Sequence, residues 1–188
     1  MKDFRNKVAA ITGAASGMGR TLALELARRG CHLSLSDVND KGLAETADMV
    51  GRFGVRVTTA KVNVADRDAV WAWAEQTARD HGKVNLVFNN AGVALGAFCE
   101  SVSLKDFEWI MGINFWGVVH GTQAFLPHLK QAGEGHIVNT SSLFGLLATP
   151  TQGTYNASKF AVRGFTEALR QELDMARCGV SATCVHPG

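Results

Sequence analysis

Apolar runs rich in β-branched residues alternate with amphipathic stretches of helical length along the chain. Alternation of this kind predicts strands and helices in turn, joined by right-handed crossovers into a parallel sheet that is covered on both faces. A helix is expected in each gap between strands. The predicted strands are Val8–Thr12, His32–Asp37, Arg56–Lys61, Leu86–Asn89, His136–Thr140 and Val180–Val185.

The first and fourth of these strands carry apolar side chains without interruption, at Val8–Ile11 and Leu86–Phe88. A strand that is buried on both faces shows such a continuous run, so we expect these two strands at the centre of the sheet. The chain contains no internal repeat, linker or charge block. Residues 1–188 are therefore predicted to form a single domain of the α/β class with a doubly wound parallel sheet.

The composition narrows the class of protein. The 188 residues include 19 Lys and Arg against 17 Asp and Glu, and 46% are hydrophobic. This balance gives no grounds for a nucleic-acid or membrane-surface partner, and the apolar content excludes a disordered chain. No apolar run approaches the roughly 20 residues of a bilayer span, so we expect a cytoplasmic protein. The cysteine and histidine spacings match no zinc pattern, which predicts reduced thiols and no metal site.

A glycine-rich turn with the sequence TGAASGMG spans Thr12 to Gly19, directly after the first strand and before a helix expected at Arg20–Arg29. Glycines let the backbone approach a pyrophosphate, whose charge is stabilised by the helix N-terminus. A lone glycine triplet is more often a tight turn, but the order of strand, turn and helix favours a dinucleotide site. The spacing GxxxGxG differs from the commonest GxGxxG fingerprint and indicates another branch of these folds.

The second predicted strand ends at Asp37, where a carboxylate can accept hydrogen bonds from both hydroxyls of an adenosine ribose. The alternative is that Asp37 caps a helix starting near Asn39. Because the carboxylate would repel a 2′-phosphate, we expect NAD rather than NADP. Arg20 and Lys41 are the nearby cations that argue for NADP.

Two further segments end strands at the same carboxyl edge, where ligands bind in folds of this type. They are Asn63–Val64, after the third strand, and Asn89–Gly92, which reads NNAG after the fourth. Taken as isolated strings, both would more often be ordinary turns.

Tyr155 is the only tyrosine, and Lys159 follows it four residues later at the start of a long helical pattern. This spacing places the ammonium and the phenol on one helix face, which favours the ionised phenol. A free phenol has a pKa of about 10, too high for a base at neutral pH without such a cation. The YxxxK pattern is common by chance, so its weight comes from its neighbours.

The fifth predicted strand brings Ser142 to the same edge, where its hydroxyl could reach a substrate oxygen that Tyr155 also contacts. The alternative for Ser142 is a turn or N-cap serine. Asn114 is a polar residue within an apolar helical stretch. Its alternative is an amide that holds backbone groups, since a buried amide needs partners.

Five motifs in this order, TGAASGMG, NNAG, the Asn114 stretch, Ser142 and YNASK, resemble the short-chain dehydrogenase/reductase family over Lys7–Gly188. The resemblance implies a Rossmann-like fold with strand order 3-2-1-4-5-6. It also implies an NAD(P)-dependent oxidoreductase that moves a hydride between NAD(H) and a secondary alcohol or ketone.

The same resemblance implies a role for each candidate catalytic residue. Tyr155 would be the general acid/base, and Lys159 would lower its pKa and bind the nicotinamide ribose. Ser142 would hydrogen-bond the substrate oxygen, and Asn114 would hold a water linking Lys159 to solvent. The expected cofactor contacts are Thr12, Gly13, Ser16, Gly17, Met18, Gly19, Asp37, Asn63, Val64, Asn90, Ala91, Gly92, Tyr155, Lys159, Pro187 and Gly188.

The chain departs from the family at Asn63, where members usually carry an aspartate that contacts the adenine amino group. An amide oxygen also accepts a hydrogen bond, so we expect little loss. Trp109 and Trp116 lie seven residues apart on one helix face, which together with the family suggests a homodimer or homotetramer. The apolar segment Leu143–Pro150 beside Ser142 favours an apolar small-molecule substrate, although packing under the sheet is the alternative.

Two other functions stay open. A catalytically idle NAD-binding module is possible on this fold, although such a module has no need of the four proton-transfer residues. An epimerase or dehydratase using tightly held NAD would carry the same motifs. Family members continue through a substrate-covering loop, a helix and a seventh strand, so we expect these 188 residues to be part of a longer polypeptide of about 250.

Overall fold

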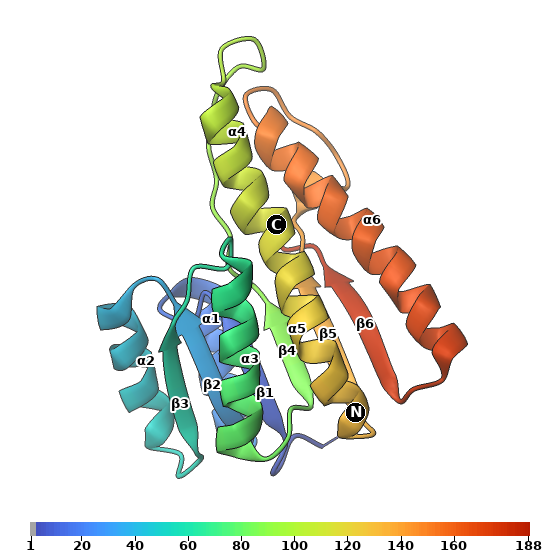
Figure 1. Cartoon of the computed structure of the whole chain (residues 1–188). Helices are drawn as coiled ribbons and strands as arrows, with labels where there is room; N and C mark the ends of the chain where they lie inside the picture. Colours follow the sequence, from blue (N-terminus) through green and yellow to red (C-terminus); the bar gives the residue numbers. More distant parts are fainter. Residues whose placement is uncertain (1–2) are drawn as a thin grey trace.

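The computed structural model describes residues 3–188 as a six-stranded parallel sheet with helices on its faces (Figure 1). The strand order is β3-β2-β1-β4-β5-β6, which confirms the predicted Rossmann-like arrangement. The strands are β1 (Val8–Thr12), β2 (His32–Asp37), β3 (Val57–Lys61), β4 (Leu86–Asn89), β5 (Gly135–Thr140) and β6 (Val180–Val185).

The continuous apolar strands lie at the centre of the sheet, as predicted. All five residues of β1 are buried, and β1 pairs with β2 on one side and with β4 on the other. Two strand boundaries differ from the prediction by one residue. Strand β3 begins at Val57 because the Arg56 N–H donates to His32 Nδ1 at 3.0 Å, and β5 begins earlier, at Gly135.

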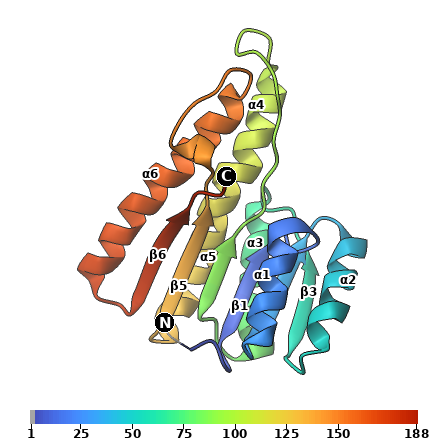
Figure 2. The ribbon, with the colours of Figure 1, turned by 180° about the vertical axis from the view of Figure 1, so that it is seen from behind.

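Two helical layers cover the sheet. Helices α1 (Gly17–Arg28) and α2 (Asp40–Gly51) lie on one side of the sheet, which Figure 2 turns toward the viewer. On the opposite side lie α3 (Arg67–His81), α5 (Gly117–Gln131) and α6 (Gly153–Ala176). Helix α4 (Leu104–Met111) continues through a π-helical turn, η1 (Gly112–Trp116), into α5. Within residues 3–188, no helix is long and apolar enough to cross a membrane.

The face of β5 and β6 that is turned away from α6 differs in character from the rest of the sheet. No helix of residues 3–188 packs on the face of these strands that is turned away from α6 (Figure 2). The side chains on that face are polar. The His136 ring is hydrogen-bonded to Ser181 Oγ at 2.7 Å and to Thr183 Oγ1 at 2.9 Å, so the two strands present a polar surface there.

Two histidines are expected to make the fold sensitive to acid. Burial lowers the pKa of His81 and of His136 below the usual 6.5. Below about pH 6.5 the unfolded chain therefore binds more protons than the folded chain. The free energy of unfolding decreases as the pH falls through this range. We expect the urea midpoint to fall between pH 7 and about 5.5, and to fall less in a His81→Gln, His136→Gln double variant. A flat midpoint in the native protein would contradict this.

Candidate active site

The glycine-rich turn joins β1 to α1 and is closely packed. Gly13 has a φ of +67°, and a Cβ there would lie 2.9 Å from the Ala91 backbone. A Cβ on Gly19 would lie 2.0 Å from the Gly13 carbonyl oxygen, which is well inside a van der Waals contact. Both positions require glycine, because one needs a left-handed backbone and the other leaves no space for a side chain.

The N-terminus of α1 opens toward the carboxyl edge of the sheet. Ser16 is its N-cap residue and is exposed, and its side chain makes no capping hydrogen bond. The hydroxyl and the first N–H groups of the helix are donors for which a phosphate is a suitable acceptor. Met18, in the first turn of α1, is 55% exposed beside them.

Thr12 and Asn90 connect this turn to the NNAG segment. Thr12 Oγ1 accepts hydrogen bonds from the N–H groups of Asn90 and Ala91, both at 2.9 Å. In return, Asn90 Nδ2 donates to the Thr12 carbonyl at 3.1 Å. These contacts hold the ends of β1 and β4 together, so the two motifs form one continuous edge.

Asp37 lies at the end of β2 and organises the neighbouring backbone. One carboxylate oxygen accepts from the Ala15 N–H at 3.0 Å and the other from the Asn39 N–H at 2.9 Å. The N-cap of α2 is Asn39, whose side chain accepts from Gly42, so the alternative that Asp37 caps this helix is wrong. A carboxylate has about four acceptor sites, so Asp37 can still accept from ribose hydroxyls.

Arg20, one of the two cations that argued for NADP, is held by protein groups. Its guanidinium donates to the Ala15 carbonyl, to Thr46 Oγ1 at 2.9 Å and to Glu45 at 3.1 Å. This network ties α1 to α2 and neutralises the charge of Arg20. The other cation, Lys41, is exposed on α2.

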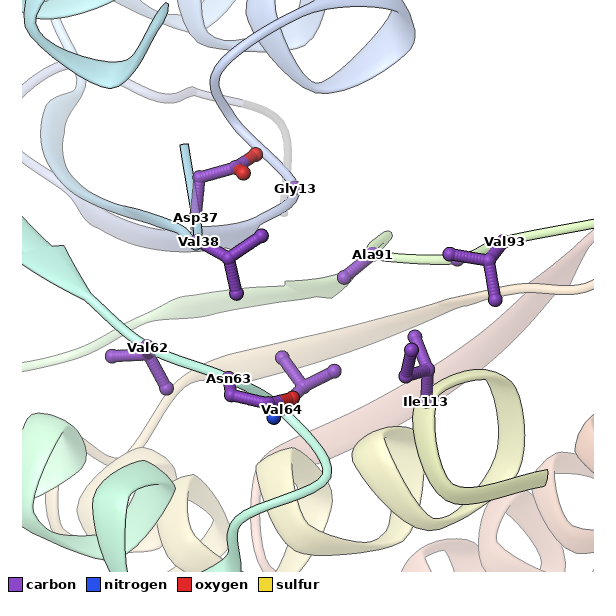
Figure 3. A pocket seen from close by; sticks show the side chains of 10 residues that line it. Gly13, Asp37, Val38, Val62, Asn63, Val64, Ala91, Val93 and Ile113 are labelled. Carbon is purple, nitrogen blue, oxygen red and sulfur yellow. The ribbon is translucent and has the colours of Figure 1, made fainter. Parts of the chain in front are cut away.

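A cavity of about 140 Å³ lies between the glycine turn and the segments that follow β2, β3 and β4 (Figure 3). Five of its lining residues besides Asp37 were predicted, and they are Gly13, Asn63, Val64, Ala91 and Gly92. Four apolar residues were missed, and they are Val38, Val62, Val93 and Ile113. Their positions next to Asp37, Asn63 and Gly92 are a signal for the valines, whereas Ile113 comes from η1 and has no such local signal.

Asn63, where the chain departs from the family, forms a local turn. Its Oδ1 accepts from the Ala65 N–H at 3.1 Å. A carbonyl oxygen has a second lone pair, so the amide retains one acceptor and both N–H donors for a base.

A second cavity, of about 210 Å³, contains Ser142, Tyr155 and Lys159 together. Its remaining walls come from the glycine turn, the NNAG segment and the ends of β5 and β6: Met18, Asn90, Gly92, Val93, Ala94, Thr140, Ser141 and Pro187. Gly188 was predicted beside the cofactor, but it is exposed and does not line this cavity. Three of the four proposed catalytic residues therefore share one cavity.

Lys159 is buried at the back of this cavity, with 4% of its surface exposed. Its Nζ donates to the Thr140 carbonyl at 2.9 Å and lies 5.5 Å from the centroid of the Tyr155 ring. Burial lowers the pKa of Lys159 to about 8, because the charged ammonium has lost water. The spacing of Tyr155 and Lys159 thus places them side by side on the first turns of α6.

Ser142 caps a short 3₁₀ turn, η2 (Leu143–Gly145), as its alternative interpretation predicted. Its Oγ accepts from the Phe144 N–H at 3.1 Å. The hydroxyl proton is not used in that bond, so Ser142 can donate to an oxygen in the cavity. The cap therefore orients the hydroxyl without preventing its use.

Asn114 lies in η1, is fully buried and does not line the cavity of Tyr155. Its Oδ1 accepts from the Val93 N–H at 2.8 Å, and its Nδ2 donates to the Val93 carbonyl at 2.9 Å and to Ser158 Oγ at 3.1 Å. The amide therefore holds a backbone segment, as its alternative predicted. A Cβ on Gly92 would lie 3.3 Å from Asn114 Oδ1 and 3.5 Å from Lys159 Nζ, so the two side chains flank the same glycine.

Comparisons with known proteins find relatives over the whole length of the chain. The sequence profile named short chain dehydrogenase matches residues 7–188. The protein SadH of Mycobacterium tuberculosis is 53% identical over the whole chain, which spans 68% of that protein.

Solved structures agree. A short chain dehydrogenase/reductase from Burkholderia phymatum in complex with NAD superposes with a TM-score of 0.97 at 41% identity, over all of this chain and 67% of that one. Carveol dehydrogenase from Mycobacterium avium, also with NAD, gives 0.94 at 32% identity, over 97% of this chain and 70% of that one.

Proposed function

The chain belongs to the short-chain dehydrogenase/reductase family of oxidoreductases, and on this premise we propose that it interconverts a secondary alcohol and a ketone with NAD(H). The observation that carries the proposal is the shared cavity of Ser142, Tyr155 and Lys159. This cavity brings together a proton acceptor (Tyr155), a hydroxyl donor (Ser142) and a cation (Lys159). These are the groups that polarising and deprotonating an alcohol requires.

In the proposed oxidation, Tyr155 as phenolate accepts the hydroxyl proton of the alcohol. The Lys159 ammonium beside the ring stabilises the phenolate charge, and burial strengthens this interaction. Ser142 donates its proton in a hydrogen bond to the same substrate oxygen, which orients the alcohol and stabilises charge on oxygen. The reverse reaction uses the same groups, with Tyr155 as the proton donor.

The residues at the carboxyl edge of the sheet fit a dinucleotide. A cavity lies there beside Gly13, Asp37 and Asn63, and the exposed N-cap residue Ser16 of α1 makes no capping hydrogen bond with its side chain. NAD⁺, when bound, supplies the acceptor for the hydride that leaves the alcohol carbon. Asp37 would hold the adenosine ribose, the α1 N-terminus with Ser16 the pyrophosphate, and Lys159 the second ribose.

NAD is the proposed cofactor rather than NADP because Asp37 is a carboxylate and because two of the cations near it are already paired. Arg20 is bound by Glu45, and Lys61 forms an ion pair with Asp40 at 2.9 Å. A 2′-phosphate would thus lie beside the Asp37 carboxylate, with Arg20 and Lys61 engaged elsewhere and Lys41 exposed to solvent. Repulsion between like charges disfavours that arrangement.

Replacing Asp37 by Ala and Val38 by Arg together should shift the ratio of kcat/KM values from NAD toward NADP. Val38 lines the cavity and is 59% exposed, so an arginine there can reach a ribose phosphate. We expect a shift of about 10- to 100-fold, which corresponds to the roughly 1.5–3 kcal/mol of a hydrogen bond to a charged group. Asp48→Ala, which removes another exposed carboxylate of α2, is the control and should leave the preference unchanged. Faster turnover of the native protein with NADP would refute the assignment.

We propose an apolar body for the substrate. Leu143, Leu146 and Leu147 follow Ser142 and are 42%, 47% and 43% exposed, so this loop does not simply pack under the sheet. Apolar side chains beside reacting groups favour an apolar ligand, because both surfaces lose water on binding.

We also propose a homo-oligomer. Helices α4 and α6 and the η1 turn expose large apolar side chains, with Leu104 74%, Trp109 46%, Trp116 50% and Phe160 42% exposed. Apolar surface of this kind is typical of an interface between identical subunits.

The test of the proposed activity combines cofactor identification with turnover. We expect native mass spectrometry of the purified protein with equimolar NAD and NADP to show mainly the NAD complex. NADH absorbance should then rise with members of a series of secondary alcohols from 2-butanol to 2-decanol and cyclohexanol. Binding of NAD with no oxidation of any alcohol would favour the catalytically idle module instead.

A further inference from the structure

The segment between Ser142 and helix α6 connects two of the proposed catalytic residues, Ser142 and Tyr155, along the chain. It contains η2 and then an irregular stretch, 146–152, with few backbone hydrogen bonds beyond its own turns. A loop of this kind needs anchors elsewhere if it is to present Ser142 in one position.

Asn156, the residue after Tyr155, supplies these anchors. Its Nδ2 donates to the Phe144 carbonyl at 2.9 Å and to the Leu147 carbonyl at 3.0 Å, and its Oδ1 accepts from the Thr149 N–H at 3.3 Å. The residue is 6% exposed. One side chain thus satisfies three backbone groups spread over six residues of the loop, and water has little access to replace it.

These contacts lead directly to the reacting groups. Phe144, whose carbonyl is held by Asn156, donates its N–H to Ser142 Oγ at 3.1 Å. The ring of Phe144 packs edge-on against Tyr155, with the centroids 6.2 Å apart. Asn156 therefore fixes a residue that contacts both the proposed oxygen-binding hydroxyl and the proposed acid/base.

The far end of the loop is held in a strained conformation. Thr151 has a φ of +66°, which is unfavourable for a β-branched residue. Such a conformation persists only where surrounding contacts enforce it. The Thr151 carbonyl accepts from the Ala97 N–H at 2.8 Å, and Asn156 holds Thr149 two residues earlier. The loop is thus held from two sides against its local preference.

We propose that Asn156 is a positioning residue that sets the conformation of the Ser142–Thr151 loop, and with it the position of the Ser142 hydroxyl and of the exposed leucines that follow it. This inference rests on the proposed alcohol oxidation for its catalytic consequence, whereas the loop conformation itself is measurable without turnover.

The variant Asn156→Asp tests the direction of the hydrogen bonds at constant shape. The carboxylate keeps the acceptor for Thr149 but turns a second oxygen toward the carbonyls of Phe144 and Leu147. Burial and these two carbonyls would raise the pKa of the introduced carboxyl above the about 3.9 of a free aspartate. Protonation restores one donor, so the defect should diminish as the pH falls.

The experiment compares native protein, Asn156→Asp, Asn156→Ala and a control, Thr166→Val. Thr166 is buried in the same helix and bonded to Asn139, away from the loop, so it matches the loss of a buried hydrogen bond. Amide hydrogen exchange of residues 143–149 is measured with saturating NAD, and kcat/KM is measured for 2-octanol oxidation at pH 8 and for 2-octanone reduction at pH 6 and 8.

We expect both Asn156 variants to exchange faster in residues 143–149, with β1 unchanged, and to lose about 10- to 100-fold in kcat/KM, as a displacement of about 1 Å can cause. The dissociation constant of NAD should not change. For reduction, the ratio of Asn156→Asp to native activity should rise from pH 8 to pH 6, and that of Asn156→Ala should not.

Unchanged loop exchange, or losses no larger than those of Thr166→Val, would overturn the role of Asn156. Faster loop exchange in the variants, combined with no turnover of either substrate by native protein, would support the role of Asn156 in the loop and count against the proposed function.

Discussion

Replacing Tyr155 with Phe is expected to lower kcat by at least the roughly 10²- to 10⁴-fold attributed to general acid/base catalysis. The substitution removes only the phenolic oxygen. The remaining ring keeps its packing against Phe144 and its position over Lys159, 5.5 Å from the ammonium. The affinity for NAD should be largely preserved, because Asp37, Ser16 and Lys159, the groups proposed to hold the two riboses and the pyrophosphate, are unchanged.

The measurement is the initial rate of NADH formation, with calorimetric titration of NAD as the control for binding. Phe144→Leu is a matched control that alters the ring contact but leaves the phenol in place, so it should cost much less. Near-normal turnover by Tyr155→Phe would show that Tyr155 is not the acid/base. The catalytically idle NAD-binding module would then be the better proposal.

Lys159→Met is expected to abolish measurable oxidation and to stabilise the protein in the absence of cofactor. The activity falls because the cation beside Tyr155 is lost. The stability rises because burial lowers the pKa of Lys159 from 10.5 to about 8, which corresponds to a cost on the order of 3 kcal/mol for the charged form. A methionine has a similar length and carries no charge, so it avoids this cost. It also loses the hydrogen bond to the Thr140 carbonyl, which offsets part of the gain.

The lowered pKa of Lys159 also makes the stability of the native protein depend on pH. The unfolded lysine keeps its proton up to about pH 10.5, whereas the folded one loses it near pH 8. The free energy of unfolding of the native protein should therefore rise from about pH 8 to 10.5, and this rise should be absent in Lys159→Met. Chemical denaturation across this range measures both. A variant less stable than native protein at pH 7 would contradict the argument.

The pattern of apolar and polar residues was sufficient to predict the architecture, because whether a strand is buried shows in its own residues. The unbroken apolar runs of β1 and β4 placed these strands at the centre, and the alternation of strands and helices gave the parallel sheet.

The grouping of side chains was predictable where one short motif places them, as it does for Tyr155 and Lys159. It was not predictable where a side chain binds residues distant in sequence. Arg20 looked like a cation available to a phosphate, but its partners Glu45 and Thr46 lie on the next helix. Asn156 has no pattern of its own, since a polar residue on a helix gives no indication of which loop its amide will hold.

The π-helical turn at Gly112–Trp116 has a consequence for how this chain can vary. A π turn closes its hydrogen bonds over five residues instead of four, so it accommodates one residue more than an α-helix of the same span. That surplus residue separates the phase of α4 from the phase of α5, which lets α4 expose Trp109 while the adjoining turn directs Asn114 into the interior. A single-codon deletion here would leave a regular and stable-looking helix and yet rotate one half against the other by about 100°. The length of this segment is therefore under tighter constraint than most of its side chains.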